Sequence, residues 1–424
     1  MSEARASWLP RAVRGSSLVY PCSLDPAALL QIQSQLAGNG ASSLRSVGTE
    51  QLLGAWNDTI SAFADPRSPE RRRLDDRLGP ASGLSQRCLN ESLGALLEGF
   101  SARESKIVID RAAKCREPLA CFVILAANIP GLALQSLLAC LALRQPVIFK
   151  LATAEPFFTP AFLDALERRE PSVAAASAAL TWPGGRRDLQ DPLCEAVDHV
   201  LAYGGADTLS ALQDRSAPKL LPFGPGASLA VLSDADPDDL PRTARALARD
   251  AVLFDQRGCL SLQVIFAQSN IGALAEAMGQ ALADAAVDLP PGTAPSSDLV
   301  RARLAREEAH FQGLDLIELP LVQGTVIVDP RPQFLASPGL RTIRIHPVDT
   351  LEIVPERLKP LRGSLQGAVL LGAAAQELRP RLERLGASHF CLPGKLQSPP
   401  ASWANGGVDL VRTLSARLRG SAAG

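Results

Sequence analysis

Residues 121–152 read CFVILAANIPGLALQSLLACLALRQPVIFKLA, and this stretch decides the fold. Its two ends, 121–127 and 146–152, are short apolar runs of the kind found in buried strands. Between them, Asn128-Ile129-Pro130-Gly131 is a turn signal, and residues 132–143 have the composition and length of a buried helix. A strand, a helix and a second strand in this order predict a βαβ unit with parallel strands and a right-handed crossover.

The same alternation continues after this unit. Helical patterns at 158–170 and 188–198 alternate with strand patterns at 177–182 and 199–205. A further strand pattern, SLAVLS at 228–233, is expected to belong to the same sheet. Such alternation predicts an open, doubly wound α/β sheet that binds ligands at the carboxyl ends of its strands.

The rest of the chain divides around this sheet. Before it, residues 48–63 and 91–105 have the patterns of amphipathic helices. After a turn signal at 234–237, alternating helix and strand patterns predict a second α/β domain. We therefore expect three parts, which are a helical lead-in with the doubly wound sheet at 1–238, a second α/β domain at 239–392, and a C-terminal segment at 393–424 that packs back on the body.

Composition argues against several classes of protein. The formal net charge is -1, and basic residues are interspersed with acidic ones, so no nucleic-acid partner is expected. The eight cysteines lack the close pairing of a disulfide framework, and neither they nor the four histidines have the spacing of a metal site, so none is expected. The N-terminus has basic residues without a following apolar segment, and a reduced, cytoplasmic location is expected.

One charge-free stretch raises the alternative of a membrane span. Residues 119–143 contain no charged side chain, and a run of roughly 25 residues is long enough to cross a bilayer. The turn signal in the middle of the run divides it into a strand and a helix. We therefore expect no membrane span.

Three landmarks carry a family resemblance: AANIPG at 126–131, VIFK at 147–150 and LFDQRGCLS at 253–261. Together they resemble the aldehyde dehydrogenase superfamily, which has an Asn-x-Pro turn, a strand ending in Lys and a Gly-Cys nucleophile motif at these places. The third landmark and residues 392–414 look like the acyl-CoA reductases of the LuxC type. The resemblance implies a cofactor-binding domain followed by a catalytic domain, and reduction of a fatty acyl-CoA or acyl-protein thioester to an aldehyde.

Cys259 is the candidate nucleophile. Thioester exchange requires an exposed and electrostatically favoured thiolate, which Gly258, by close backbone approach, and the adjacent Arg257 are expected to help arrange. The alternative is a buried cysteine that only packs, as free cysteines commonly do. Asn128 is the candidate oxyanion donor together with the backbone N–H of Cys259, and a plain turn-capping role is its alternative.

The resemblance also implies a nicotinamide cofactor. Lys150 would bind the adenosine ribose, with a snorkelling lysine as the alternative. NAD-preferring relatives often have Glu at the position of Thr153, so NADPH is predicted, with NADH as the alternative because Glu155 is close. Gly204 and Gly205 match the turn against the cofactor pyrophosphate, and an ordinary tight turn is their alternative.

An absent carboxylate favours reduction. Aldehyde-oxidising relatives carry Glu-Leu-Gly-Gly where this chain has Pro222-Phe223-Gly224-Pro225. Without a base to activate water, an acyl-enzyme is expected to survive until it meets a thiol or a hydride, unless a Glu elsewhere serves. His346 is a weaker candidate acid or base, with a structural histidine as the alternative.

Three other functions stay open on these residues. They are an aldehyde-oxidising dehydrogenase, a non-catalytic acyl-binding protein on the same fold, and an acyltransferase that uses the thiol without a dinucleotide. As partners, the resemblance implies an acyl thioester substrate, an acyl-activating protein and further copies of the chain in a homo-oligomer.

Overall fold

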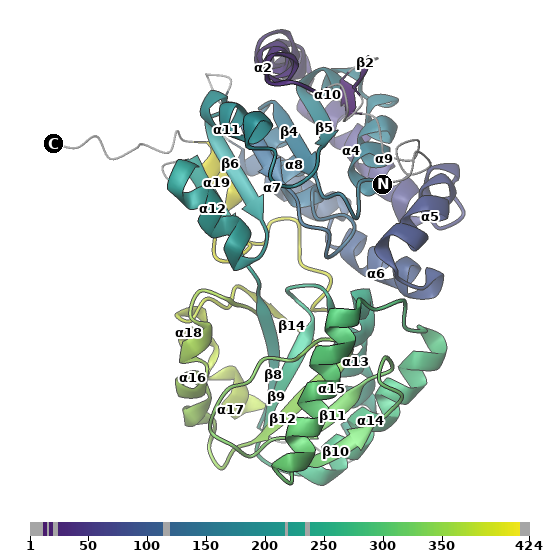
Figure 1. The fold of residues 1–424 in the computed structure, drawn as a ribbon, viewed down its shortest axis with the longest axis vertical. Helices are drawn as coiled ribbons and strands as arrows, with labels where there is room; N and C mark the ends of the chain where they lie inside the picture. The colour runs from purple at the N-terminus through teal and green to yellow at the C-terminus, as the bar shows by residue number, and fades with distance from the viewer. Residues whose placement is uncertain are drawn as a thin grey trace, which may run out of the picture.

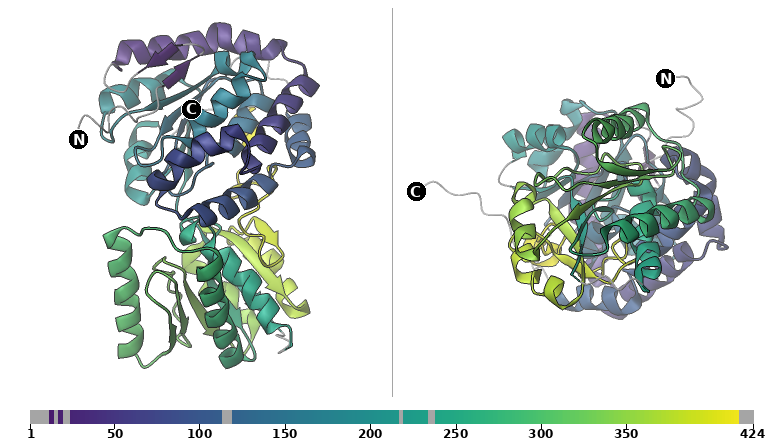
Figure 2. Two further views of the ribbon diagram at one scale, coloured as in Figure 1. Left: turned by 90° about the vertical axis from the view of Figure 1, so that its right-hand side faces the viewer. Right: turned by 90° about the horizontal axis from the view of Figure 1, so that it is seen from below.

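The structure, a computed structural model, describes residues 12–14, 17–19, 24–112, 119–216, 219–233 and 238–415. Within these residues, two seven-stranded sheets form the centres of two α/β bodies, which lie one above the other in Figure 1. The views in Figure 2 show helices beside the sheet in each body. Cys22, Cys115 and the turn predicted at 234–237 lie outside the described residues.

The first sheet is doubly wound, as predicted, and has the order β2-β1-β5-β4-β3-β6-β7. Its parallel strands are β3 (Cys121–Ile124), β4 (Val147–Leu151), β5 (Ser177–Thr181), β6 (His199–Tyr203) and β7 (Leu220–Phe223), and an antiparallel hairpin of β1 (Ala12–Arg14) and β2 (Ser17–Val19) extends the β5 edge. The chain runs from β3 to β5 in one direction and then continues on the other side of β3. The order of strands therefore reverses between β3 and β6, and such a switch point is where sheets of this kind bind ligands.

The stretch 121–152 folds as predicted. Strands β3 and β4 pair in parallel, and α8 (Leu134–Ala142) connects them. All residues of β3 are buried, and so is every residue of α8 except Gln135. The charge-free run is thus the core of the first body, and none of the described helices has the length and apolarity that a bilayer crossing requires.

The other helices of the first body pack around this sheet (Figure 1). They are α2 (Pro26–Gln35), η2 (Leu36–Gly40), α3 (Ala41–Ser46), α4 (Thr49–Ala64), α5 (Pro69–Ser82), α6 (Gln86–Glu98), α7 (Ala102–Arg111), α9 (Phe158–Glu167), α10 (Pro171–Ala176), α11 (Arg187–Ala196) and α12 (Ala206–Ser216). The single helix expected at 91–105 is wrong, because α6 ends at Glu98 and α7 begins three residues after Gly99. A Cβ added at Gly99 would lie 2.0 Å from the carbonyl oxygen of Pro399, so the chain turns where another segment approaches its backbone.

The second sheet has the order β10-β11-β12-β9-β8-β13-β14, and among its described strands only the β10 edge is antiparallel. Its strands are β8 (Ala227–Leu232), β9 (Leu262–Ala267), β10 (Asp315–Glu318), β11 (Thr325–Val328), β12 (Thr342–Pro347), β13 (Leu365–Leu371) and β14 (His389–Cys391). Its helices are α13 (Leu240–Val252), η4 (Leu253–Gln256), α14 (Ile271–Asp288), α15 (Ser296–Phe311), η5 (Leu351–Ile353), α16 (Val354–Arg357), η6 (Lys359–Leu361), α17 (Ala373–Gln376) and α18 (Arg379–Glu383).

Strand β8 corrects one prediction. The pattern at 228–233 was expected in the first sheet, but β8 lies at the centre of the second sheet, between β9 and β13. All six residues of β8 are buried. Its apolar sequence is therefore compatible with the centre of either sheet, and only the strands to which it is hydrogen-bonded show which sheet it belongs to. Sheet membership therefore changes between Phe223 and Ala227, ahead of the boundary expected at 238.

After β14 the chain returns to the first body, as the yellow segment of Figure 1 shows. The backbone N–H of Ala401 donates to Gly99 O at 2.8 Å. The side chain of Gln145 donates to Leu414 O at 2.7 Å, at the end of α19 (Leu410–Leu414). The C-terminal segment thus joins the core of the first body, where Leu410 and Leu414 are buried.

Candidate active site

The loop that carries Cys259 begins with an unusual turn. Phe254, Asp255 and Gln256 have φ values of 54, 50 and 61°, which is the left-handed region. This conformation costs non-glycine residues roughly 1–2 kcal/mol each, so three in succession require support from their surroundings. The turn reverses the chain between α13 and β9, and it brings Cys259 to the boundary between the two bodies.

A buried ion pair provides part of that support. The Asp255 carboxylate contacts Arg341 at 2.6 Å (Nη2) and 3.1 Å (Nε), and it accepts the backbone N–H of Gly292 at 2.9 Å. Arg341 is completely buried and also lies in the left-handed region, with φ of 57°. The pair ties the nucleophile loop to the chain segment just before β12.

Hydrogen bonds of Phe254 and Gln256, the neighbours of Asp255, also hold the turn in place. The Gln256 amide donates to Leu262 O at 2.7 Å and to Thr342 O at 2.8 Å, and it accepts the N–H of Thr342 at 2.9 Å. The N–H of Phe254 donates to Ser92 Oγ at 2.8 Å, which reaches the turn from α6 of the first body. Sequence reasoning missed these residues, although a polar Asp-Gln pair inside an otherwise apolar run was a usable signal.

The Arg257 side chain contacts two other segments of the chain. Its guanidinium donates to Ser82 O, at the end of α5, and to Thr293 O at 2.9 Å. These bonds link the nucleophile loop to the first body, and they give no support to the expectation that Arg257 favours the thiolate.

Cys259 is half-buried, and its thiol is a weak acid. Burial raises its pKa to about 11, and hydrogen bonds from the backbone of Cys259 and Leu260 lower it only in part. The thiol lines a cavity of about 60 Å³ between α6, α8 and the C-terminal segment, and Leu96, Phe100 and Pro400 are among the apolar walls. The alternative of a cysteine that only packs in the core does not fit a thiol that faces a cavity.

The Asn128 corner meets the Cys259 loop, although the two are far apart in the sequence. The Asn128 side-chain Nδ2 donates to Arg257 O at 3.3 Å, two residues before the thiol. This nitrogen has a second hydrogen, which remains for another acceptor. Gly131 has φ of 85°, and a Cβ there would lie 2.6 Å from Leu96 Cδ2, so the turn is packed tightly against α6.

The predicted cofactor residues lie at the carboxyl edge of the first sheet, on both sides of β3. Lys150 is at the end of β4 with its ammonium 5.8 Å from the centre of the Trp182 ring, and burial lowers its pKa. No ion pair joins it to a carboxylate in the described part of the chain. Gly204 and Gly205 follow β6 and precede α12, and an added Cβ at Gly205 would meet nothing within 4 Å. An unpaired ammonium opposite an open turn at the switch point fits a dinucleotide.

Thr153 and Glu155, which bear on the choice of cofactor, differ in exposure. The Thr153 side chain is exposed just after β4. The Glu155 carboxylate accepts the N–H groups of Phe157 and Phe158 at 2.9 Å each, and burial raises its pKa to about 7. Glu155 is thus bonded to the start of α9, where one of its oxygens satisfies two backbone donors.

The segment that lacks the expected carboxylate lies at the end of β7. Phe223 stacks on Tyr203 at the end of β6, with ring centroids 4.7 Å apart. Among the described residues, none of those that line the thiol cavity carries a carboxylate. A water-activating Glu brought in from elsewhere thus finds no support among the described residues.

His346 lies away from the thiol. It pairs in register with Phe266 near the far end of β9, whereas Cys259 precedes the beginning of that strand. The imidazole is buried, stacks on Phe266 at 5.3 Å, and bonds Asp329 O at 2.8 Å through Nδ1. The structure therefore favours the structural alternative for His346.

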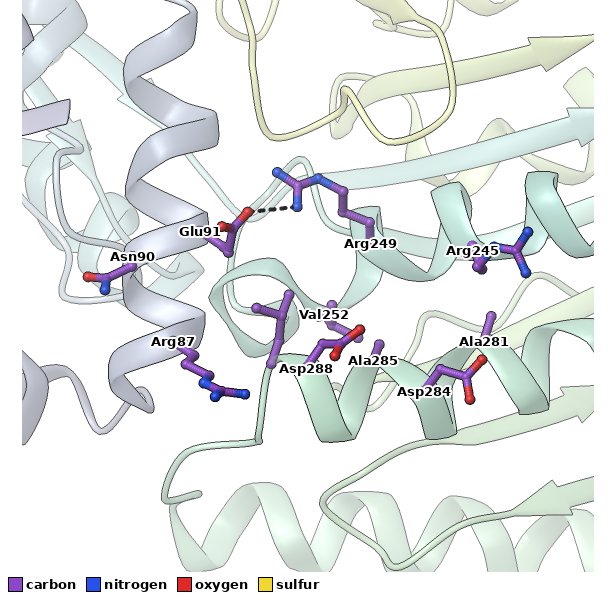
Figure 3. A pocket seen from close by; sticks show the side chains of 11 residues that line it. Arg87, Asn90, Glu91, Arg245, Arg249, Val252, Ala281, Asp284, Ala285 and Asp288 are labelled. Carbon is purple, nitrogen blue, oxygen red and sulfur yellow. Dashed lines mark hydrogen bonds and ion pairs between the residues drawn. The ribbon is translucent and has the colours of Figure 1, made fainter. Parts of the chain in front are cut away.

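Two larger cavities lie outside the thiol pocket. One of about 520 Å³ is bounded by α6, α13 and α14 and has charged walls, where Arg249 and Glu91 form an ion pair at 3.0 Å (Figure 3). The other, of about 480 Å³, is lined by Asn128, Arg257 and Arg301. Cys259 lines neither cavity, but Asn128 lines the second.

Comparison with protein families gives a match over most of the chain. The model of the family described as acyl-CoA reductase (LuxC) matches residues 87–416. A long-chain acyl-protein thioester reductase of Aliivibrio fischeri is 25% identical over 239 residues, which are 55% of this chain and 50% of the relative. A second such reductase, from Vibrio harveyi, is 24% identical over 242 residues, 56% of this chain and 50% of the relative. The chain thus spans about half the length of the curated relatives it matches.

Solved structures establish the fold. Methylmalonate-semialdehyde dehydrogenase from Oceanimonas doudoroffii has a TM-score of 0.74 and 13% identity, with 95% of this chain and 96% of that chain covered. This likeness confirms the predicted aldehyde dehydrogenase-like α/β fold with its two sheets.

Proposed function

Because the chain belongs to the acyl-CoA reductase (LuxC) family, we propose that it reduces an acyl thioester to an aldehyde through an acyl-enzyme on Cys259. One observation carries the proposal. The thiol opens on a largely apolar cavity, while its loop is bonded to Asn128 at the switch point of the first sheet. An acyl chain and a dinucleotide would thus reach the same sulfur from different sides.

In the first step the Cys259 sulfur attacks the thioester carbonyl and forms a new C–S bond. The carbonyl oxygen becomes an oxyanion, which the free hydrogen of Asn128 Nδ2 and the N–H of Cys259 would stabilise. When the carbonyl re-forms, the bond to the donor's sulfur breaks, and the departing thiolate takes up the proton that Cys259 released. The products are an acyl-enzyme and a free thiol.

A reduced nicotinamide bound at the switch point would supply the hydride for the second step. Lys150 would bind its ribose, and Gly204 and Gly205 would let the backbone approach its pyrophosphate. The alkoxide that results expels the Cys259 thiolate and leaves as the aldehyde. At the end of β7, Pro222 to Pro225 offer no carboxylate to activate water, so hydrolysis of the acyl-enzyme does not compete.

NADPH is the proposed cofactor, and NADH is the alternative. Thr153 places no negative charge against a 2′-phosphate, and the Glu155 carboxylate already accepts two backbone N–H groups. The Lys150 ammonium lacks a carboxylate partner among the described residues and would gain one in the phosphate. We also propose that the acyl group comes from CoA or from an acyl-activating partner protein, and that the chain forms a homo-oligomer.

The test compares wild type with Cys259→Ala in a single turnover of radiolabelled acyl-CoA. Wild type should become labelled, and addition of NADPH should release the label as a trapped aldehyde. Cys259→Ala should do neither. A labelled Cys259→Ala protein would refute the proposal, and so would free acid formed from an aldehyde and NADP⁺ without any thiol acceptor, which would indicate an oxidising dehydrogenase.

A further inference from the structure

His346 belongs to a group of polar side chains on one face of the second sheet. Arg344 and His346 of β12 pair in register with Val264 and Phe266 of β9, and residues in register in a parallel pair point to the same face. Val354, the first residue of α16, shares a buried apolar cluster with these two β9 residues. Figure 1 shows α16 on one side of this sheet and α14 on the other. Helix α16 therefore covers the face that carries Arg344 and His346.

Three side chains in this group have buried nitrogens without a hydrogen-bond partner among the described residues. They are Arg344 at Nε, His346 at Nε2, and Arg357 of α16 at Nε and Nη1. Arg344 and His346 are only 3% and 1% exposed, whereas Arg357 is half-buried. Burial lowers the pKa of His346, and the positive charges of Arg344 and Arg357 lower it further, so both guanidinium groups lie near the imidazole. Buried polar groups in proteins are nearly always hydrogen-bonded, so these nitrogens favour an acceptor from outside the chain.

The carboxylates nearby are already paired. Asp329, directly after β11, contacts Arg344 Nη1 at 3.0 Å and Arg331 Nη2 at 2.8 Å. Glu308 of α15 contacts Arg331 Nη1 at 3.2 Å. When Arg357 is included, three positive charges are opposed by two negative ones. These five groups therefore have one positive charge in excess.

The His346 imidazole can add a further donor. Its Nδ1 lies 2.8 Å from Asp329 O, and a carbonyl oxygen only accepts, so Nδ1 carries a hydrogen. The neutral ring then has a lone pair at Nε2, whereas the protonated ring has a donor there. A negative charge beside Nε2 favours the protonated ring. Protonation brings the local excess to two positive charges, which a dianion would balance.

We propose that the space between β12 and α16 is a binding site for a phosphate-type oxyanion, held by Arg344, Arg357 and the protonated His346. The planar guanidinium groups match the oxygens of a phosphoryl group, whose two negative charges match the local excess. The site lies toward the carboxyl ends of β9 and β12, the edge at which sheets of this kind bind ligands. Cys259 precedes the opposite end of β9, so this site is separate from the proposed acyl site. Arg357 is partly exposed, so the anion would enter on the side of α16.

Isothermal titration calorimetry of the full chain in a phosphate-free buffer tests the site, with inorganic phosphate as the probe. Wild type should bind one phosphate ion per chain in a saturable reaction. Arg357→Gln removes a charged donor and should weaken binding by about tenfold or more. His346→Phe removes the Nε2 donor and should weaken binding as well. Arg384→Gln, the same change at an exposed position of the second body, is the matched control and should bind like wild type.

Thermal unfolding separates binding at this site from general screening of charge. Phosphate at about ten times its dissociation constant should raise the Tm of wild type by about 2 °C or more, relative to sodium chloride of equal ionic strength. Glycerol 3-phosphate is the second probe, and its binding would show that the site takes the phosphoryl group of an organic molecule, whereas binding of phosphate alone would show a site for the free ion. Either result supports the site. A wild type that binds neither probe, an equal rise of Tm in chloride, or wild-type affinity in Arg357→Gln or His346→Phe would overturn it.

Discussion

The replacement Asp255→Ala should destabilise the second body strongly, because it leaves a buried guanidinium without its counter-ion. Arg341 is completely buried, and its Nη1 has no hydrogen-bond partner among the described residues. Breaking a buried ion pair by removing one partner costs about 3–5 kcal/mol. The N–H of Gly292 would also lose its acceptor, which places the expected loss in the upper part of that range.

Urea unfolding followed by circular dichroism measures this loss. The matched control is Glu383→Ala, which removes one side of an exposed ion pair with Arg379 on α18 and should cost about 0.5 kcal/mol or less. The double variant Asp255→Leu with Arg341→Leu should recover part of the loss, since no unpaired charge remains. A loss below about 1 kcal/mol for Asp255→Ala would refute the view that this pair supports the strained turn.

Three further predictions concern the same loop and its surroundings. Asn128→Ala should lower the rate of Cys259 acylation, measured in a single turnover, by about 10²–10³-fold without changing the stability of the fold. A change below threefold would remove Asn128 from the oxyanion site. Alkylation of Cys259 by iodoacetamide should become faster as the pH rises toward 11. Burial raises the thiol pKa to about 11, and only the thiolate reacts. A rate that levels off below pH 8 would contradict this prediction. Gly99→Ala should lower the thermal stability, because the new methyl group would overlap Pro399 O. Gly94→Ala, on the open face of α6, should leave the stability unchanged. Equal effects of the two replacements would contradict the close approach of Pro399 to Gly99.

Local patterns predicted four of the seven described strands of the first sheet, β3 to β6, and missed β1, β2 and β7. The stretch 121–152 folds as expected because both strands and the helix between them are buried. Cys259 and Asn128 were also selected from sequence, and the structure brings their loops into contact. The predictions that were wrong or missing share a physical cause. In each case the residue that determines the local structure lies far away in the sequence.

Three residues illustrate this cause. Nothing near Asp255 indicates Arg341, 86 residues later, so the support of the turn was invisible. Arg257 is next to Gly258 and Cys259 in the sequence, but its guanidinium donates to the carbonyl oxygens of Ser82 and Thr293. The break after α6 depends on Gly99 meeting a backbone 300 residues away, which no helix pattern contains.

The position of residues 399–403 in the chain has a consequence for biosynthesis. Residues 399–403 follow every strand of both sheets in chain order, yet they close the cavity beside Cys259. Because domains fold from the N-terminus as they leave the ribosome, both sheets can form while this pocket is still open to water. A nascent chain therefore carries the Cys259 sulfur beside an open pocket until residues 399–403 have been translated.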